Sequence, residues 1–596
     1  MKRLHFSLGP VQSFVSQARR TRDLWAGSFL LSYLTGHAMN AVLTHGGEIE
    51  FPVITDLSAN ISDPLLQAIQ QHSSDGPQIG SLPNRFVARV PDDFQPLWCV
   101  EAIHNQWNVL ADAVWHHFIE PVSDLGRDTR AIWDRQITNF WEISWVIGEE
   151  PDLLDRRKNW RSHAYPIETG RKCSMMPQWQ EISGHVTNHK ARETFWHAVR
   201  QSISREASSL DLQEGEELSA IALIKRLFPY VAKEAIGWSV DESYRSTVDL
   251  AAASWVYNQC KNQPDLCDAY ARMGKTFVRR KKSLPASWRQ LAQANPSVKA
   301  FMQMDANSWY ANTLLNDRLW NDDGSRSVRE ELAEKLKEFN SSPDTYFAIL
   351  LMDGDHLGRL LRSYSPREVS EALKIFTERV PEIVQDHEGE LIYAGGDDVL
   401  ALFPVEKALT AGLALRQHYA HAMKGMGTIS AAIIYAYYHA PLTELIHDAH
   451  HILDHVAKDQ NGRDSLALSV ITSGGPISTW SSKWDVLYAS SINRLEYLAE
   501  QVQTRMSSQF LFKISELESK LGAQSFMDDD FWEHLFAYEL RRTREREVPN
   551  QTEDVDTISQ TILDLSHGYH GMPDTSRYQN LLYMIHFLSK RMRLNV

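Results

Sequence analysis

Cysteine is scarce in this sequence, and its scarcity restricts where the protein works. The 596 residues include only four cysteines: Cys99, Cys173, Cys260 and Cys267. Four are too few to build a disulfide framework in a chain of this length. We therefore expect a protein of a reducing compartment, the cytoplasm.

Long apolar runs are also missing. No stretch approaches the roughly 20 residues that a helix needs to span a bilayer, and the most apolar segment, 429–438, has the length of a strand. The basic N-terminus is not followed by the apolar core of a signal peptide, because Gly9, Pro10 and Gln12 interrupt it. The sequence thus predicts no membrane segment and no secretory signal.

Positive charge is not in excess. Lysine and arginine number 61, aspartate and glutamate 76, and the formal net charge is −15. This excludes a uniformly basic coat for nucleic acid, but it allows an acidic site that holds a metal ion and a triphosphate. Ordinary proportions of apolar (43%) and charged (23%) residues exclude a disordered or collagen-like chain, and the length predicts about three to five domains.

The richest pattern lies between residues 345 and 471. Continuous apolar runs of strand length predict buried strands, and apolar residues at helical spacing predict helices between them. The predicted strands are 345–352, 391–394, 399–403, 429–437 and 465–471, and the predicted helices are 367–385, 405–421 and 442–458. The order β-α-β-β-α-β-α-β is the ferredoxin-like pattern with additions.

A weaker copy of this pattern opens the chain. The segment 45–51 (HGGEIEF) is similar to 387–393 (HEGELIY), and each follows a strand, a glycine turn and a helix. Duplication of a domain and chance similarity over so short a stretch both explain this. The copy lacks paired aspartates, because Pro52, Val53 and Ile54 follow Phe51.

The other regions are helical in pattern. They are a middle segment of about 150–340 and everything beyond Ser482, in which the acidic stretch 552–557 is predicted as a loop. We expect an α+β protein of four domains. These are a first domain over 1–150, a helical middle domain over 151–340, a second ferredoxin-like domain over 341–480 and a C-terminal helical domain over 481–596.

Three carboxylates are the strongest candidates for chemistry. Asp353 ends one predicted strand, while Asp397 and Asp398 stand at the tip of a hairpin that pairs beside it. Converging carboxylates form an all-oxygen site suited to Mg²⁺ or Mn²⁺, and two such ions can activate a hydroxyl and stabilise leaving pyrophosphate. The alternative interpretation of Gly-Gly-Asp-Asp is a plain polar hairpin turn.

Glycine and basic residues surround these carboxylates in the sequence. Gly354, Gly395 and Gly396 allow a backbone to approach a nucleotide closely. Lys458 and Arg463, at a helix end before a strand, are candidates to bind its phosphates. The alternative for both is a solvated helix C-terminus, which favours basic residues anyway.

Several motifs resemble one family. Residues 9–14 (GPVQSF), 18–25 (ARRTRDLW) and 82–86 (LPNRF) are similar to the first palm domain of the large subunit of type III CRISPR effector complexes, Cmr branch (type III-B). Asp353-Gly354-Asp355 and Gly395-Gly396-Asp397-Asp398 are similar to the active motif of its second palm, and 458–463 to the lysine-bearing segment shared with GGDEF-type cyclases. The resemblance spans residues 5 to about 475.

The resemblance implies a fold and an activity. It implies two palm domains with helical middle and C-terminal domains, and a second palm that makes cyclic oligoadenylate from ATP when the complex binds target RNA. Asp353, Asp397 and Asp398 would hold Mg²⁺ or Mn²⁺, with Asp355 as an acidic neighbour, and the first palm would bind the other ATP without catalytic carboxylates. The implied partners are guide RNA, target RNA and the backbone, guide-handle and small subunits, with no membrane.

Two departures from the family pattern carry expectations. The first palm strand begins at about Arg3, so we expect no N-terminal HD nuclease domain. The cysteine zinc site of relatives is degenerate, because Met176 stands where a C-x-x-C beginning at Cys173 would end and the segment 217–226 has no cysteine. A thiolate site needs about four ligands, so no zinc is expected.

Three alternatives to an oligoadenylate synthase remain open. Some members of the family join ATP to S-adenosylmethionine, and the acceptor pocket is not readable from the sequence. A scaffold subunit without catalysis is a second alternative, against which the intact Asp397-Asp398 pair argues. A free-standing diguanylate cyclase is a third, and it leaves the N-terminal copy and the helical domains unexplained.

Overall fold

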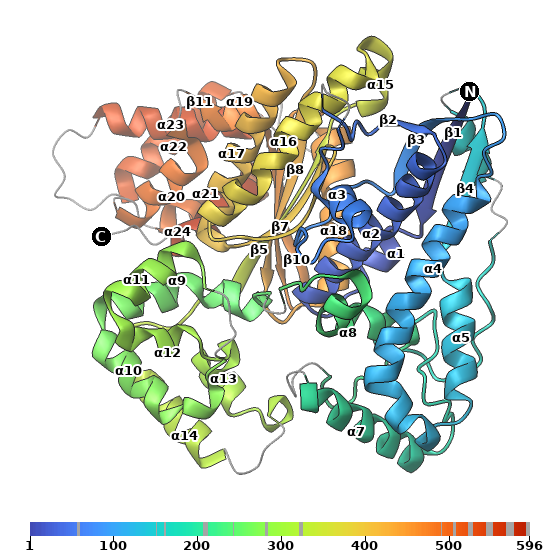
Figure 1. Cartoon of the computed structure of the whole chain (residues 1–596). Coiled ribbons are helices and arrows are strands. Elements are labelled where there is room, and N and C mark those ends of the chain that lie inside the picture. Colours follow the sequence, from blue (N-terminus) through green and yellow to red (C-terminus); the bar gives the residue numbers. More distant parts are fainter. Residues whose placement is uncertain are drawn as a thin grey trace.

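The computed structural model describes residues 1–56, 60–150, 152–159, 163–206, 212–241, 244–279, 284–320, 326–489, 492–504, 508–521, 529–543, 552–567 and 577–591. Two main sheets, each with helices packed on it, stand side by side, and helical segments flank them (Figure 1). The predicted α+β class with two ferredoxin-like palm domains is confirmed. Among the described helices, none combines the length and apolar character needed to cross a bilayer, and all four cysteines are buried free thiols.

The first sheet comes from the N-terminal part of the chain. Its strands are β1 (Lys2–Gly9), β2 (Glu48–Phe51), β3 (Arg85–Val90) and β4 (Glu142–Ile147), in the antiparallel order β2-β3-β1-β4. The long helices α2 (Thr21–Thr44) and α4 (Leu97–Val114) pack on each other, and α2 also contacts β2 and β3. Alternate residues of β1, namely Leu4, Phe6 and Leu8, are fully buried in this core.

The second sheet has six strands in the order β10-β9-β8-β5-β7-β6, antiparallel except for the parallel pair β8 and β9. The strands are β5 (Tyr346–Gly354), β6 (Glu390–Gly395), β7 (Asp398–Pro404), β8 (Ile429–Tyr437), β9 (Ser465–Thr472) and β10 (Gly475–Lys483), and the helices between them are α15 (Leu357–Ser363), α16 (Pro366–Asp386), α17 (Val405–Met423) and α18 (Leu442–His451). A π-helix, η9 (Ile452–Gln460), continues α18. Each predicted strand and helix of this region is present, and β10 is an addition that the pattern did not predict.

Strand β5 is apolar along its whole length because both faces of it are buried. Phe347, Ile349 and Leu351 face the core that continues into the first palm. The alternate residues Ala348, Leu350 and Met352 face a second core shared with α16, α17 and the C-terminal helices. A strand buried on both faces reads as an uninterrupted apolar run rather than as an alternation.

The two sheets share one topology. The order β2-β3-β1-β4 of the first matches β6-β7-β5-β8 of the second, strand for strand along the chain. The packing between them is reciprocal, since α2 contacts β6 and α16 contacts β2. This agreement favours duplication over chance similarity as the origin of the N-terminal copy.

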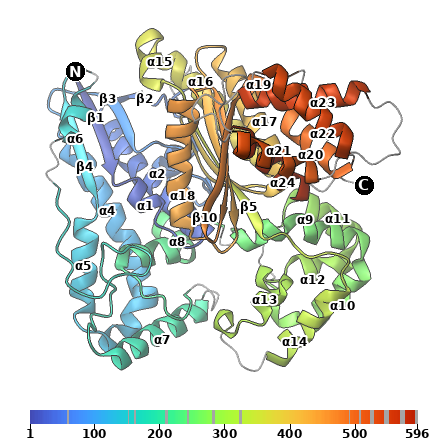
Figure 2. The ribbon, with the colours of Figure 1, turned by 180° about the vertical axis from the view of Figure 1, so that it is seen from behind.

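The middle helices lie against different parts of the molecule. Helix α8 (Ala220–Ile236) packs on α2 and α4, and α9 (Thr247–Asn262) packs on β5 and β7. Figure 2 shows α7 below the first palm and α10 to α14 gathered near α9. The remaining long helices of this region are α7 (His189–Glu206), α10 (Pro264–Met273), α11 (Ala286–Ala294) and α14 (Arg326–Lys335).

The C-terminal segment is helical and packs on the second palm, away from the first (Figures 1 and 2). Its main helices are α20 (Arg494–Thr504), α21 (Ser508–Leu521), α22 (Asp529–Thr543), α23 (Thr552–His567) and α24 (Arg577–Arg591). The loop predicted over 552–557 is wrong, because α23 begins at Thr552. Acidic residues are favoured in the first turn of a helix, where they face the positive end of its dipole.

Candidate active site

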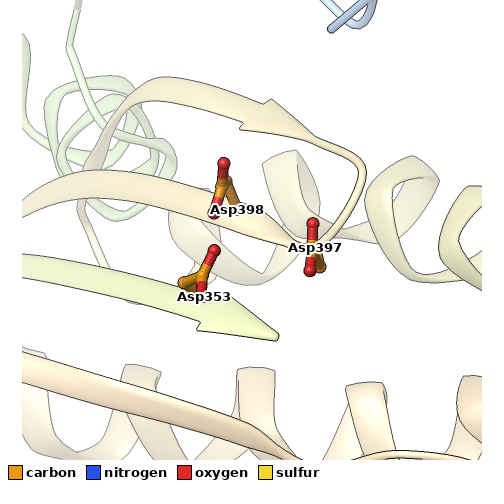
Figure 3. Close-up of side chains that lie close together, drawn as sticks. All are labelled: Asp353, Asp397 and Asp398. Atoms are coloured by element: carbon orange, nitrogen blue, oxygen red, sulfur yellow. The ribbon is translucent and has the colours of Figure 1, made fainter. Parts of the chain in front are cut away.

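Three carboxylates meet at one end of the second sheet. Asp353 lies near the end of β5, which pairs antiparallel with β7. Met352 is opposite Val399, so Asp353 and Asp398 are the next residues of the two strands at this end of the sheet. One carboxylate oxygen each from Asp353, Asp397 and Asp398 lies within 4.8 Å of the others (Figure 3). All three side chains are partly exposed. Among the described residues, this is the one group of three or more Asp, Glu, His or Cys side chains close enough together to hold a metal ion.

The hairpin between β6 and β7 is as short as the sequence predicts. Gly395 pairs with Asp398, which leaves Gly396 and Asp397 as the two turn residues. Gly396 has φ +65°, a left-handed conformation that favours glycine at this place in a two-residue hairpin. The turn thereby carries Asp397 to the tip of the hairpin and Asp398 to the first residue of β7.

Gly354 allows β5 and the hairpin to approach each other. A Cβ atom at this residue would lie 2.6 Å from Asp397 Oδ2, 2.7 Å from Asp397 Cβ and 2.9 Å from the Tyr419 hydroxyl. The contacts of Gly395 are with Tyr393 of its own strand, where a Cβ would collide with the ring. A nucleotide-binding role for the three glycines stays a prediction.

Burial makes the charged form of this carboxylate group unfavourable. It raises the pKa of Asp397 to about 6, with a smaller contribution from Asp355. It also raises the pKa of Asp398 well above its ordinary value, and the charges of Asp397 and Asp454 add to the effect. Carboxylates held together in this way are stabilised by a bound cation, and an all-oxygen donor set fits Mg²⁺ or Mn²⁺.

Lys458 reaches the carboxylates from the π-helix η9. Its ammonium group forms an ion pair with Asp353 Oδ2 and lies 4.0 Å from Asp454 Oδ1. Burial, assisted by the charge of Arg463, lowers the pKa of Lys458 to about 8. The structure therefore joins Lys458 to the site, and π-helical turns of this kind recur at functional sites.

Arg463 lies five residues further along and is held differently. Its backbone N–H donates to the carbonyl oxygens of Ala457 and Lys458, at 3.1 Å each. Its Nε is buried without a hydrogen-bond partner among the described residues. The charge of Arg463 is close enough to lower the pKa of Lys458. A role of Arg463 in binding phosphate stays a prediction.

The resemblance gave Asp355 only as an acidic neighbour of the site, and sequence reasoning did not assign Asp454. Asp355 is 3% exposed and accepts hydrogen bonds from other parts of the palm, so it does not join the carboxylate group. Asp454 precedes Lys458 by one helical turn and is close enough to affect the pKa of Asp398. The spacing of Asp454 and Lys458 was a signal that could have pointed to their contact.

Two family models match this chain. Residues 346–467 match the second palm domain of Cas10/Cmr2, and residues 3–112 match the N-terminal domain of the CRISPR-associated protein Cmr2. This chain thus contains two regions of Cas10/Cmr2 type. The matches cover β1 to β3 of the first palm and most of the second, including the three carboxylates and Lys458, and they agree with the Cmr branch that the sequence motifs resemble.

The chain is also similar to the Cmr2 subunit of the Pyrococcus furiosus CRISPR Cmr system. The two are 24% identical over 636 aligned positions, which cover 91% of this chain and 70% of the relative. A type III-B Cmr-beta structure in the apo state matches with a TM-score of 0.66 at 15% identity, over 98% of this chain and 81% of that chain. The same type of complex bound to cognate target RNA gives 0.63 at 13% identity, over 98% and 83%. At these identities the structural likeness establishes a common fold.

Proposed function

We propose that this protein is the RNA-activated nucleotidyltransferase subunit of a type III-B CRISPR effector complex and makes cyclic oligoadenylate from ATP. The observation that carries the proposal is the group of Asp353, Asp397 and Asp398 beside Lys458, on a Cas10/Cmr2 palm. A scaffold without catalysis gives no reason to hold three carboxylates together in a partly buried place at a cost in free energy.

The proposed partners follow from the relatives. Two structural neighbours are type III-B Cmr-beta assemblies, one of them bound to cognate target RNA. We assign to this chain a guide RNA, a target RNA and the other subunits of such a complex as partners.

Asp353, Asp397 and Asp398 would hold one or two Mg²⁺ or Mn²⁺ ions. When bound, such ions lower the pKa of an attacking hydroxyl and stabilise leaving pyrophosphate. In the proposed reaction the 3′-hydroxyl oxygen of one ATP bonds to the α-phosphorus of another, and the bond from that phosphorus to the pyrophosphate oxygen breaks. The hydroxyl proton passes to solvent.

Lys458 contributes to this reaction through its position. Its ammonium group is paired with Asp353 and has a second carboxylate, Asp454, within 4.0 Å. A triphosphate at the carboxylates would meet this ammonium group directly, and a point charge of this kind orients phosphate oxygens. The lowered pKa of Lys458, about 8, leaves most of the side chain charged at neutral pH.

Mass spectrometry of the products tests the proposal. The complex is assembled with guide and matching target RNA and supplied with Mg²⁺ or Mn²⁺ and ATP, with and without S-adenosylmethionine. We expect oligoadenylate from ATP alone, and a loss of more than about 100-fold in the Asp397→Ala, Asp398→Ala variant, since even partners that only orient metal ligands are worth 10- to 100-fold.

A matched control removes an exposed carboxylate from the same domain. Asp386→Ala, at the exposed end of α16, keeps full product formation. An adduct that forms only with S-adenosylmethionine would move the assignment to that acceptor. No product under either condition, with RNA binding intact, would leave a scaffold subunit and contradict the proposal.

A further inference from the structure

Three consecutive residues adopt the left-handed backbone conformation between η9, which carries Lys458, and β9. They are Gly462 (φ +71°), Arg463 (φ +64°) and Asp464 (φ +41°), and β9 begins at the next residue. Glycine adopts this conformation freely, whereas arginine and aspartate do so at a cost. Such a run persists only where surrounding contacts hold it.

The contacts that hold this turn come from three sides. The Arg463 N–H donates back to Ala457 and Lys458, which fixes the turn to the end of η9. The Lys483 ammonium group donates to the carbonyl oxygens of Gly462 and Arg463. The Asp464 N–H donates to Asp355 Oδ2 at 3.0 Å, which fixes the turn to the segment that follows β5.

Asp355 is the centre of a buried hydrogen-bond group. Its Oδ2 also accepts from the Thr428 hydroxyl at 2.7 Å, and its Oδ1 accepts from the Ser430 hydroxyl at 2.8 Å. Its own N–H donates to the Thr428 carbonyl oxygen at 2.9 Å. One carboxylate therefore joins the ends of β5 and β8 to the left-handed turn, two residues from the proposed metal ligand Asp353.

We propose that Asp355 is a positioning residue that sets the place of Lys458. The Asp355 carboxylate holds the turn 462–464 against the end of β5. The hydrogen bonds of this turn then fix the last residues of η9, so that the Lys458 ammonium group stays beside Asp353. This inference rests on the proposed function and deepens it, because it separates affinity for the triphosphate, which depends on Asp355, from metal ligation, which does not.

The geometry distinguishes this role from that of a metal ligand. An asparagine at residue 355 can reproduce the contacts: its carbonyl oxygen takes the place of Oδ2, and its NH₂ donates to Ser430, whose hydroxyl rotates to accept. A metal ligand needs the carboxylate charge, so the same change would abolish its function. An alanine leaves the Thr428 and Ser430 hydroxyls and the Asp464 N–H without this acceptor.

The test compares Asp355→Asn, Asp355→Ala and Asp353→Asn in the full chain. Mn²⁺ affinity is measured by electron paramagnetic resonance, and binding of ATP and of adenosine by calorimetry. We expect Asp355→Ala to weaken ATP binding by about 10-fold or more, the effect of losing one hydrogen bond to a charged group. Mn²⁺ affinity and adenosine binding stay within about twofold, and Asp355→Asn keeps ATP affinity within about threefold. Asp353→Asn loses Mn²⁺ binding.

Two further measurements keep the proposal falsifiable. Hydrogen exchange over residues 459–468 reports the turn itself, and we expect faster exchange in Asp355→Ala but not in Asp355→Asn. If Asp355→Ala does not fold, Thr428→Val removes one donor and weakens ATP binding in the same direction. In a Lys458→Met background, Asp355→Ala adds no further loss of ATP affinity, because the group that it positions is absent.

Opposite outcomes overturn the proposal. Loss of Mn²⁺ binding in Asp355→Asn would make Asp355 a ligand, and unchanged ATP affinity in Asp355→Ala would leave it without a positioning role. The exchange and binding measurements need no turnover, so a wild-type chain that binds Mn²⁺ and ATP without forming product would contradict the proposed function alone.

Discussion

Lys225 is fully buried in α8, a rare environment for a lysine. Its ammonium group donates to the carbonyl oxygens of Phe14 and Gln17, and it lies 5.2 Å from the centre of the Phe14 ring. These two carbonyl groups belong to the segment between β1 and α2, so the lysine fixes this connection to α8 of the middle segment. Burial lowers the pKa of Lys225 to about 7, although the nearby charge of Asp23 acts in the opposite direction.

The lowered pKa of Lys225 predicts a pH dependence of stability. Between about pH 7 and the ordinary lysine value of 10.5, the unfolded chain keeps a proton on this group that the folded chain has released. The free energy of unfolding therefore rises with pH between these two values. Below about pH 7 the group is charged in both states, and the cost of burying the charged ammonium group is present in full. The free energy of unfolding in urea, measured from pH 6.5 to 9.5, is expected to increase with pH in the wild type relative to Lys225→Met.

A second lysine of the same helix supplies the control for this prediction. Lys233 is exposed on α8, so Lys233→Met leaves the pH dependence as in the wild type. A difference between wild type and Lys225→Met that is flat or falls with pH would mean that Lys225 keeps its proton in the folded state.

At the scale of elements, the junction between β5 and the β6–β7 hairpin decides the geometry of the carboxylates. Gly354→Ala would place a Cβ atom 2.6 Å from Asp397 Oδ2 and 2.7 Å from Asp397 Cβ, and the Asp397 Cβ is fixed to the hairpin backbone, so side-chain rotation cannot relieve this contact. We expect the hairpin to move and Asp397 with it. Product formation falls by about 100-fold and Mn²⁺ affinity by about 10-fold, while overpacking costs about 1–3 kcal/mol of unfolding free energy.

Gly358 offers a matched control for this substitution. A Cβ atom there has no neighbour within 4 Å, and the residue lies in α15, where alanine is favoured over glycine by roughly 0.5–1 kcal/mol. Gly358→Ala is expected to keep product formation and to stabilise the protein slightly, as measured by urea unfolding. Equal activity of Gly354→Ala and wild type would show that the carboxylates do not need the spacing that Gly354 allows.

Elements with a strong local pattern could be predicted from the sequence, and others could not. The helix predicted over 367–385 is α16, because a capping box at Ser365 and Glu368 and a regular apolar stripe define it locally. Strand β10 was missed because its buried residues include Ser478, Ser481 and Ser482, which hide the apolar alternation. The π-helix η9 was predicted only as ordinary helix, since apolar spacing over one turn does not separate the two.

The candidate site was predictable in its residues but not in its contacts. Asp353, Asp397 and Asp398 stand at a strand end and at a hairpin tip, and both positions follow from the local pattern. The roles of Asp355, Tyr419 and Asp454 depend on contacts between segments far apart in the sequence, such as the hydrogen bond from the Asp464 N–H to Asp355, 109 positions away. Register of this kind is set by the assembled sheet and is not visible in either segment alone.

At the scale of the whole molecule, the two palms are joined by reciprocal packing and by one buried arginine. Arg245, from the middle segment, forms an ion pair of 2.6 Å with Glu390 of β6 and also donates to the Glu388 carbonyl oxygen. Its own carbonyl oxygen accepts from the Thr21 hydroxyl of α2 at 2.8 Å. One residue therefore links the first palm to the edge strand of the second, a connection over 145 positions of sequence that no local pattern predicts.

This linkage predicts a large cost for removing one partner. Arg245 is 4% exposed and Glu390 21%, so Arg245→Ala leaves a mostly buried carboxylate without its cation. Breaking a buried pair costs about 3–5 kcal/mol, and we expect the lower end, about 3 kcal/mol, because Glu390 keeps some contact with solvent. Urea unfolding measures this cost, and Arg156→Ala, which removes an exposed ion pair, is the control with at most about 1 kcal/mol.

A double variant separates the charge of Glu390 from the packing of Arg245. Glu390→Gln in the Arg245→Ala background removes the uncompensated carboxylate, so part of the lost free energy of unfolding returns. A cost for Arg245→Ala no greater than that of Arg156→Ala would mean that the reciprocal contacts of α2 with β6 and of α16 with β2 hold the palms together without the arginine. A cost near 3 kcal/mol with partial recovery would instead make the Arg245–Glu390 pair the electrostatic link that fixes β6, and with it the hairpin that carries Asp397, against the first palm.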